Sequence, residues 1–142
     1  MSVRIRRLRP SDYAGFVELL KVSGMEPRTQ GRESRKSFSV QLGNPRNRYL
    51  GAFDGRRLVG VVLGTHDGRK GWINRLAVHP DRRRIHIASR LVRMCERGLR
   101  EQGIQMFAAL IEADNAASKA VFQSLGYEIS PMLCARKLHP GV

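Results

Sequence analysis

The chain has 142 residues, of which 42% are hydrophobic and 27% are charged, and a formal net charge of +14. A chain of this length and apolar content can bury about two thirds of its surface in one core, which excludes an intrinsically disordered chain and removes the need for disulfides or a structural metal. Its 2 cysteines have no C-x-x-C or Cys/His spacing, so neither a disulfide framework nor a zinc site is expected, and the expected compartment is the reducing cytoplasm. No apolar stretch has the length of a signal peptide or a membrane span, so we expect neither secretion nor membrane insertion.

The first third of the chain predicts one strand and two helices. Apolar residues alternate with arginines before Pro10, as in a strand with one buried face. Ser11 and Asp12 are typical of a helix start, and Gly24 marks the end of that helix or the loop beyond it. A second helix is expected over about residues 33–42, because the sequence Gly-Asn-Pro follows and stops it.

The middle of the chain predicts three strands. Residues 49–53 and 58–65 are apolar runs joined by Asp54-Gly55, a strong two-residue turn signature. Asp67-Gly68 repeats this turn and leads to a third apolar run, residues 72–78. Strands that follow one another through such short turns should form an antiparallel meander.

The last third of the chain alternates between helices and strands. Over residues 87–103, apolar side chains recur every four positions and arginines face elsewhere, which predicts an amphipathic helix. Residues 107–111 are a nearly continuous apolar run, as in a central strand, and should pair in parallel with the third meander strand. We expect a helix over residues 115–126 and one or two strands over residues 127–138. No repeat or linker appears, so we expect one mixed α/β domain, residues 1–142.

The most informative segment runs from Leu76 to Leu91, where a strand passes through a basic turn directly into an amphipathic helix. The first amides of a helix have no intrahelical partners, and the helix dipole places partial positive charge at the same end. Together with Arg82, Arg83 and Arg84, these amides predict a phosphate-binding site. The alternative is an ordinary exposed turn between a strand and a helix.

The same segment resembles motif A of the GNAT superfamily of N-acetyltransferases, R/Q-x-x-G-x-G/A. Arg83 occupies its first position, His86 that of the central glycine and Ala88 the last. Residues 115–127 resemble motif B, N-x-x-A-x-x-L-Y-x-x-x-G-F/Y. The resemblance, to a bacterial-type member, implies a mixed α/β GNAT fold, with a central mixed, mostly antiparallel sheet of six to seven strands, about four flanking helices, and a V-shaped opening between strands 4 and 5.

This resemblance implies acetyl-CoA as co-substrate, no metal, and direct attack of an amine on the thioester. The backbone of Ala77 and Val78 would contact the pantetheine arm and polarise the thioester carbonyl. The basic turn and the start of the following helix would hold the pyrophosphate, and the last helix would line the far side of CoA. The implied cofactor-binding residues are Leu76, Ala77, Val78, Arg83, Arg84, Ile85, His86, Ile87, Ala88, Ser89, Asn115, Ser118 and Phe122.

Three residues depart from the family pattern. His86 replaces a glycine that lets the backbone approach phosphate closely, although histidine enters positive φ more readily than most residues. Phe122 stands where many members carry the tyrosine that protonates the leaving thiolate, and Asn74 where many carry a glutamate as general base. Glu112, at the end of the expected fifth strand, is the alternative candidate for the base, acting through a water. A merely solvated carboxylate is the other interpretation of Glu112.

These features favour an N-acetyltransferase that transfers the acetyl group of acetyl-CoA to a primary amine, either a small molecule or a protein N-terminus. The alternative is a CoA-binding protein of the same fold with weak or no catalysis. The positive charge by itself suggests nucleic acid, but the basic runs lack interleaved aromatics and any helix-turn-helix signature, so we expect no specific nucleic-acid partner. We expect no membrane partner, and either a monomer or a homodimer.

Overall fold

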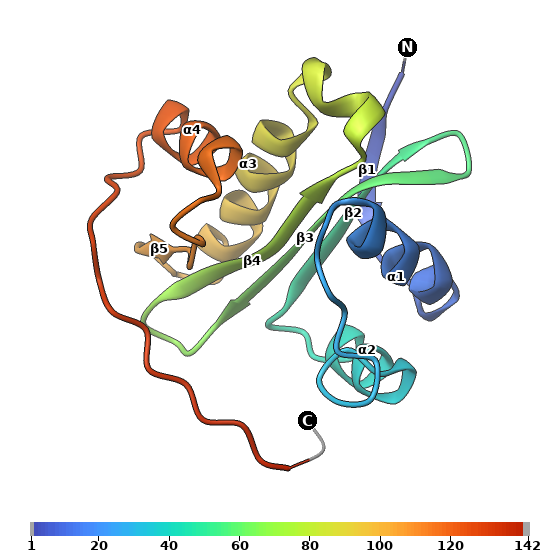
Figure 1. Cartoon of the computed structure of the whole chain (residues 1–142), viewed down its shortest axis with the longest axis horizontal. Coiled ribbons are helices and arrows are strands. Elements are labelled where there is room, and N and C mark those ends of the chain that lie inside the picture. Colours follow the sequence, from blue (N-terminus) through green and yellow to red (C-terminus); the bar gives the residue numbers. More distant parts are fainter. Residues whose placement is uncertain (1, 141–142) are drawn as a thin grey trace.

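The computed structural model describes residues 2–140, except for the side chains of Arg84 and Ile85. Figure 1 shows a sheet with helices on both of its faces. In chain order the elements are β1 (Arg4–Arg7), η1 (Pro10–Asp12), α1 (Tyr13–Val22), α2 (Arg35–Leu42), β2 (Arg48–Asp54), β3 (Arg57–His66), β4 (Gly71–Val78), η2 (Pro80–Ile85), α3 (Ile87–Arg100), β5 (Phe107–Ala108) and α4 (Ala116–Ser124), where η denotes a 3-10 helix. α2 begins at Arg35 rather than at Glu33, because Ser34 precedes it as the cap and its Oγ accepts a hydrogen bond from the N–H of Ser37 (3.1 Å).

The strands form one sheet in the order β1-β2-β3-β4-β5. β2, β3 and β4 are the expected antiparallel meander, and β5 pairs with β4 in parallel after α3. Gly55 and Gly68, in the two turns of the meander, have φ of +62° and +89°, a backbone conformation that glycine adopts without steric cost. The predicted mixed α/β fold with a mostly antiparallel sheet is therefore confirmed.

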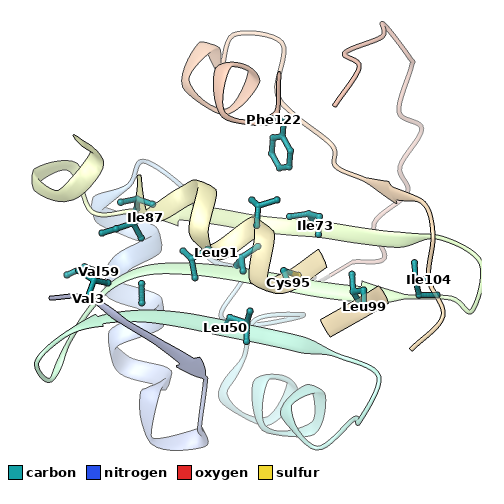
Figure 2. Close-up of a cluster of buried hydrophobic side chains, with 14 residues drawn as sticks. Val3, Leu50, Val59, Ile73, Ile87, Leu91, Cys95, Leu99, Ile104 and Phe122 are labelled. Carbon is teal, nitrogen blue, oxygen red and sulfur yellow. The ribbon is translucent and has the colours of Figure 1, made fainter. Parts of the chain in front are cut away.

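Two apolar clusters hold the helices against the sheet. α3 packs on one face through Ile87, Leu91, Cys95 and Leu99, all of them buried (Figure 2). A glycine in β3 lets this helix come close, because a Cβ atom at Gly64 would lie 2.2 Å from the Sγ of Cys95. The cluster on the other face, under α1 and α2, consists of Leu8, Phe16, Leu19, Leu20, Phe38, Phe53, Val61, Leu63 and Ala77.

The end of the chain differs from the prediction. Residues 128–140 form no strand, and all of them are exposed, including Met132 and Leu133. In Figure 1 this segment leaves α4 as an extended chain. β5 covers Phe107–Ala108 rather than residues 107–111, so the sheet of the described chain has five strands and not six to seven. Apolar composition predicts a strand only when a neighbouring strand accepts and donates its hydrogen bonds, and Pro131 lacks the N–H to donate.

Candidate functional site

A β-bulge interrupts β4 in the middle of the sheet. Val61 pairs with Ala77 and Leu63 with Asn74, so two residue steps along β3 match three along β4. The bulge includes Arg75, whose φ of +51° lies in the left-handed region. This conformation costs a residue other than glycine about 1–2 kcal/mol, so the contacts around Arg75 must hold it there. The bulge also withdraws backbone groups of β4 from the regular ladder.

β4 and β5 separate beside this bulge. Gly71 pairs with Phe107 and Trp72 with Ala108, and no further pair joins the two strands in the described structure. Residues 73–78 of β4 therefore pair with β3 on one side and present an open edge on the other, as the resemblance to the GNAT fold implied.

A basic turn joins the bulged strand to α3. His86, between η2 and α3, has φ of +57° and ψ of +30°, the left-handed conformation that the glycine of motif A would adopt freely. The side chain of His86 does not cap α3, so the first amides of this helix and the positive end of its dipole point into the turn. The exposed Arg83 is tied to the end of β4 through a hydrogen bond from its Nε to the carbonyl oxygen of Val78 (3.2 Å).

Arg82 is paired with acidic neighbours. Its Nη2 lies 3.0 Å from Oδ2 of Asp54, and its Nη1 lies 3.4 Å from Oδ1 of Asp81. The ion pair with Asp54 holds η2 on the end of β2, which gives Arg82 a structural role, and its expected contact with phosphate stays a prediction. The side chains of Arg84 and Ile85, two further predicted contacts, lie outside the described part of the structure.

The loop between α1 and α2 reaches the bulge from the other side. Nε and Nη2 of Arg75 lie 2.5 and 2.7 Å from the two carboxylate oxygens of Glu33, which is 6% exposed. Oε1 of Glu33 also accepts a hydrogen bond from the N–H of Arg28 (2.7 Å), and Nη2 of Arg75 donates to the carbonyl oxygen of Glu26 (3.2 Å). The same loop borders a hollow of about 490 Å³ lined by Lys21, Gly24, Met25, Glu26, Pro27 and Thr29.

Neither Glu33 nor Arg75 is predicted from the sequence as a site residue. A signal for the bulge was nevertheless present, because Asn74 and Arg75 are consecutive polar residues in an apolar strand and break its alternation. The partner of Arg75, in contrast, lies 42 residues away and has no signature in the sequence.

The groups proposed as general base occupy different surroundings. Asn74 is half-buried on β4, next to the bulge, whereas Glu112 is exposed in the segment that follows β5. Burial, together with the nearby carboxylate of Glu33, raises the pKa of Tyr49, so its phenol stays protonated at neutral pH. Glu33 itself is engaged by Arg75.

Several predicted cofactor-binding residues meet in one cluster. Phe122 on α4 is buried and packs edge to face against Tyr127, with ring centroids 4.9 Å apart. Asn115 caps α4, because its Oδ1 accepts a hydrogen bond from the N–H of Ser118 (3.0 Å). The predicted residues that share the apolar cluster between β4, α3 and α4 are Leu76, Val78, Ile87, Ala88 and Phe122.

This arrangement suits an extended ligand with an anionic end. The open edge of β4 offers backbone hydrogen bonds to an extended chain, and the start of α3 with its basic turn offers amides and positive charge to a phosphate. Among the described residues, no three His, Cys, Asp or Glu side chains gather in a way that would hold a metal ion. None of the described helices is both long and apolar enough to cross a bilayer.

Sequence comparison matches the chain to a family model and to two bacterial relatives. Residues 13–127 match the model of the acetyltransferase (GNAT) family. An acetyltransferase of Sodalis glossinidius is 32% identical over 83 residues, which cover 57% of this chain and 58% of that protein. An acetyltransferase of Pectobacterium atrosepticum is 35% identical over 71 residues, which cover 50% of each. The matched region thus spans about half the length of these relatives.

Solved structures share the fold at low sequence identity. The PaiA N-acetyltransferase of Thermoplasma acidophilum, in complex with coenzyme A, superimposes with a TM-score of 0.81 at 18% identity, covering 92% of each chain. The ribosomal-protein-S18-alanine N-acetyltransferase of Escherichia coli gives a TM-score of 0.74 at 18% identity, covering 92% of this chain and 80% of that one. The family model matches most of this chain, and the chain has the bulged fourth strand and the basic turn of that fold. This chain therefore belongs to the acetyltransferase (GNAT) family.

Proposed function

We propose that this protein is an N-acetyltransferase that transfers the acetyl group of acetyl-CoA directly to a primary amine. The observation that carries the proposal is the open, bulged edge of β4 leading straight into the uncapped, basic start of α3. CoA joins a hydrogen-bonding pantetheine arm to a pyrophosphate, and these two halves match the two halves of the site.

Acetyl-CoA fits the residues present. The backbone of Leu76, Ala77 and Val78 would bind the pantetheine arm and direct N–H groups at the thioester carbonyl, where negative charge develops during attack. The first turn of α3, from Ile87 to Ser89, and the exposed Arg83 would bind the pyrophosphate.

The other predicted contacts divide between the turn and α4. Arg84, Ile85 and His86 belong to the turn before α3, while Ser118 and the cap residue Asn115 begin the helix on the far side of the cofactor. Phe122 would contribute an apolar wall, because it is buried and has no proton to donate. A thiol of pKa about 8.5 leaves as thiolate at neutral pH with a penalty of only about one to two pH units, so the missing acid slows the reaction without abolishing it.

The acceptor is inferred from the weakness of the available bases. Glu33 is engaged by Arg75, Asn74 does not take up a proton at neutral pH, and Glu112 is an exposed carboxylate. Deprotonating a lysine at neutral pH costs about 4–5 kcal/mol, whereas a peptide α-amine costs about 1–1.5 kcal/mol. We therefore propose an acceptor of low pKa, such as a protein N-terminus or a small-molecule amine, with Glu112 as the candidate base acting through a water.

Thiol release from acetyl-CoA, measured over a panel of peptides with free N-termini, small amines and lysine side chains, tests the proposal. We expect turnover with α-amines, and a rate that rises with pH until the α-amine is deprotonated. Good turnover of an ordinary lysine with a pH profile that follows its high pKa would overturn the choice of acceptor. Loss of turnover in Glu112→Gln would support Glu112 as base, and unchanged turnover would remove it from the mechanism.

The alternative function is CoA binding with weak or no catalysis. It is favoured by two observations, the uncharged Asn74 beside the bulge and the buried Phe122 in place of an acid. Calorimetry separates the two functions, because tight binding of CoA without thiol release to any amine in the panel would support the alternative.

A further inference from the structure

A buried ion pair connects the bulge to the loop between α1 and α2. Glu33 is 6% exposed and the side chain of its partner Arg75 is 23% exposed, so the pair is largely shielded from water. The contact is bidentate, since Nε and Nη2 of Arg75 each lie within 2.7 Å of a separate carboxylate oxygen. This planar geometry fixes the direction of the guanidinium as well as its distance.

Glu33 also makes the hydrogen bonds that fix the loop between α1 and α2. Its carboxylate accepts a hydrogen bond from the N–H of Arg28, five residues earlier. Its backbone carbonyl oxygen accepts a hydrogen bond from the hydroxyl of Tyr13 on α1 (2.7 Å). The next residue, Ser34, caps α2. The carboxylate of Glu33 therefore ties the loop to the bulge, while its backbone carbonyl oxygen holds α1 beside the start of α2.

Arg75 needs such support because of its backbone. Its left-handed φ of +51° is strained for a residue with a side chain, and strained residues persist only where their surroundings fix them. The two residues that follow, Leu76 and Ala77, begin the stretch of β4 proposed to polarise the thioester. Any relaxation of the backbone at Arg75 would thus rotate the N–H groups of Leu76 and Ala77 away from the thioester carbonyl of bound acetyl-CoA.

From these contacts we propose that Glu33 and Arg75 are positioning residues for acetyl transfer. Their ion pair locks the loop between α1 and α2 onto the bulge and holds the backbone of Leu76–Val78 in the conformation that activates the thioester. The inference rests on the proposed function of the site, to which it adds the device that fixes its geometry. Neither side chain is assigned a contact with the reacting atoms.

Three variants separate this role from a general loss of stability. Glu33→Gln keeps the size of the side chain and removes the charge. Arg75→Gly removes the guanidinium but keeps a residue that adopts the left-handed backbone freely. Asp12→Asn is the matched control, because Arg6 and Asp12 form a similar pair (2.9 Å, side chains 23% and 12% exposed) that connects β1 to η1 and does not touch the bulge.

The first readout is kinetic. In Glu33→Gln we expect kcat/KM for the best amine to fall at least about tenfold, mostly through kcat, while the calorimetric Kd for CoA rises by a smaller factor, because α3 and its turn, which would bind the pyrophosphate, are unchanged. Arg75→Gly should lose less in kcat than Glu33→Gln, and Asp12→Asn should stay within about twofold of the wild type. Unchanged kinetics in Glu33→Gln, or an equal loss in Asp12→Asn, would overturn the proposal.

The second readout does not depend on activity. Arg28 and Arg32 are trypsin sites within the anchored loop, and Arg136 in the exposed C-terminal segment provides an internal control in the same chain. We expect cleavage after Arg28 to be at least about tenfold faster in Glu33→Gln and in Arg75→Gly, and cleavage after Arg32 to be similarly faster in Arg75→Gly, where Glu33 still follows the cut bond. Cleavage after Arg136 should be unchanged in both variants. If the wild type acetylates no amine, the proposed function fails. Trypsin cleavage alone then tests whether the pair of Glu33 and Arg75 anchors the loop on the bulge. Faster loop cleavage in the variants would support the anchor, and unchanged cleavage would overturn it.

Discussion

Replacing His86 by glycine tests how the turn before α3 meets phosphate. His86 stands at the glycine position of motif A and has φ of +57°. A left-handed conformation destabilises a residue with a side chain by about 1–2 kcal/mol, and glycine removes this strain. The greater freedom of glycine in the unfolded chain offsets about 0.5–1 kcal/mol of the gain. His86→Gly should therefore stabilise the fold by about 0.5–1 kcal/mol, which raises Tm by about 2–4 °C for a domain of this size.

The same substitution should tighten the binding of acetyl-CoA. Removing the side chain lets phosphate approach the amides of the turn and of α3 more closely, and a gain of about 1 kcal/mol corresponds to an about fivefold lower Kd. Isothermal calorimetry gives Kd, and thermal unfolding without ligand gives the effect on the backbone. His86→Ala is the matched control, because it removes the imidazole but keeps a Cβ atom and the strained backbone, so it should gain no stability and less affinity than His86→Gly.

The two measurements can refute the reasoning separately. An unchanged or lower Tm in His86→Gly would contradict the strain assigned to this residue. Unchanged or weaker binding of acetyl-CoA would contradict the idea that the side chain keeps phosphate away. A similar loss of affinity in both variants would instead identify the imidazole as a phosphate ligand.

Three further predictions concern the fold. Gly64→Ala should destabilise the protein by about 1–3 kcal/mol, because its Cβ would lie 2.2 Å from the Sγ of Cys95. Adding Cys95→Ala should restore most of this loss. If the free energies of unfolding in urea show that the two substitutions simply add, the contact is contradicted. Burial raises the pKa of Cys95 to about 12, whereas Cys134 is exposed. A disulfide reagent at pH 8 should therefore modify one thiol in the native protein and none in Cys134→Ser. Rapid labelling of Cys134→Ser would show that Cys95 is accessible. Partial burial opposes ionisation of Asp12, but hydrogen bonds from Arg6 and the backbone of Arg9 outweigh it and lower the pKa of this carboxyl. The stabilisation is therefore complete above the ordinary value of about 3.9 and is lost as pH falls through the lower folded value, so the difference in stability between wild type and Asp12→Asn should shrink toward pH 2 in urea titrations; a constant difference down to that pH would contradict the assignment.

Much of this fold was predictable because its signals are local. The Asp-Gly pairs fixed two hairpin turns whose glycines do have positive φ, and Asn115 caps the helix that it was expected to open. The four-residue apolar spacing from Ile87 predicted a helix with one buried face, and that face packs on the sheet. Turn chemistry, caps and periodicity each act within a few residues, so a sequence reports them directly.

The C-terminal segment shows where local signals fail. Residues 127–138 have the apolar content of a strand, yet residues 128–140 remain extended and exposed. Composition measures how well a residue fits a sheet, whereas a strand forms only where another strand lies within hydrogen-bonding reach.

The sequence by itself determined the class of this protein, through the order of its elements and two motifs that each occupy a short continuous stretch. Only the tertiary structure decided how the site is built. It brought Glu33 to Arg75 across 42 residues and paired Arg82 with Asp54. The reason is physical: periodicity and turn chemistry specify the backbone around a residue, but which charges meet depends on how separately formed elements pack against one another.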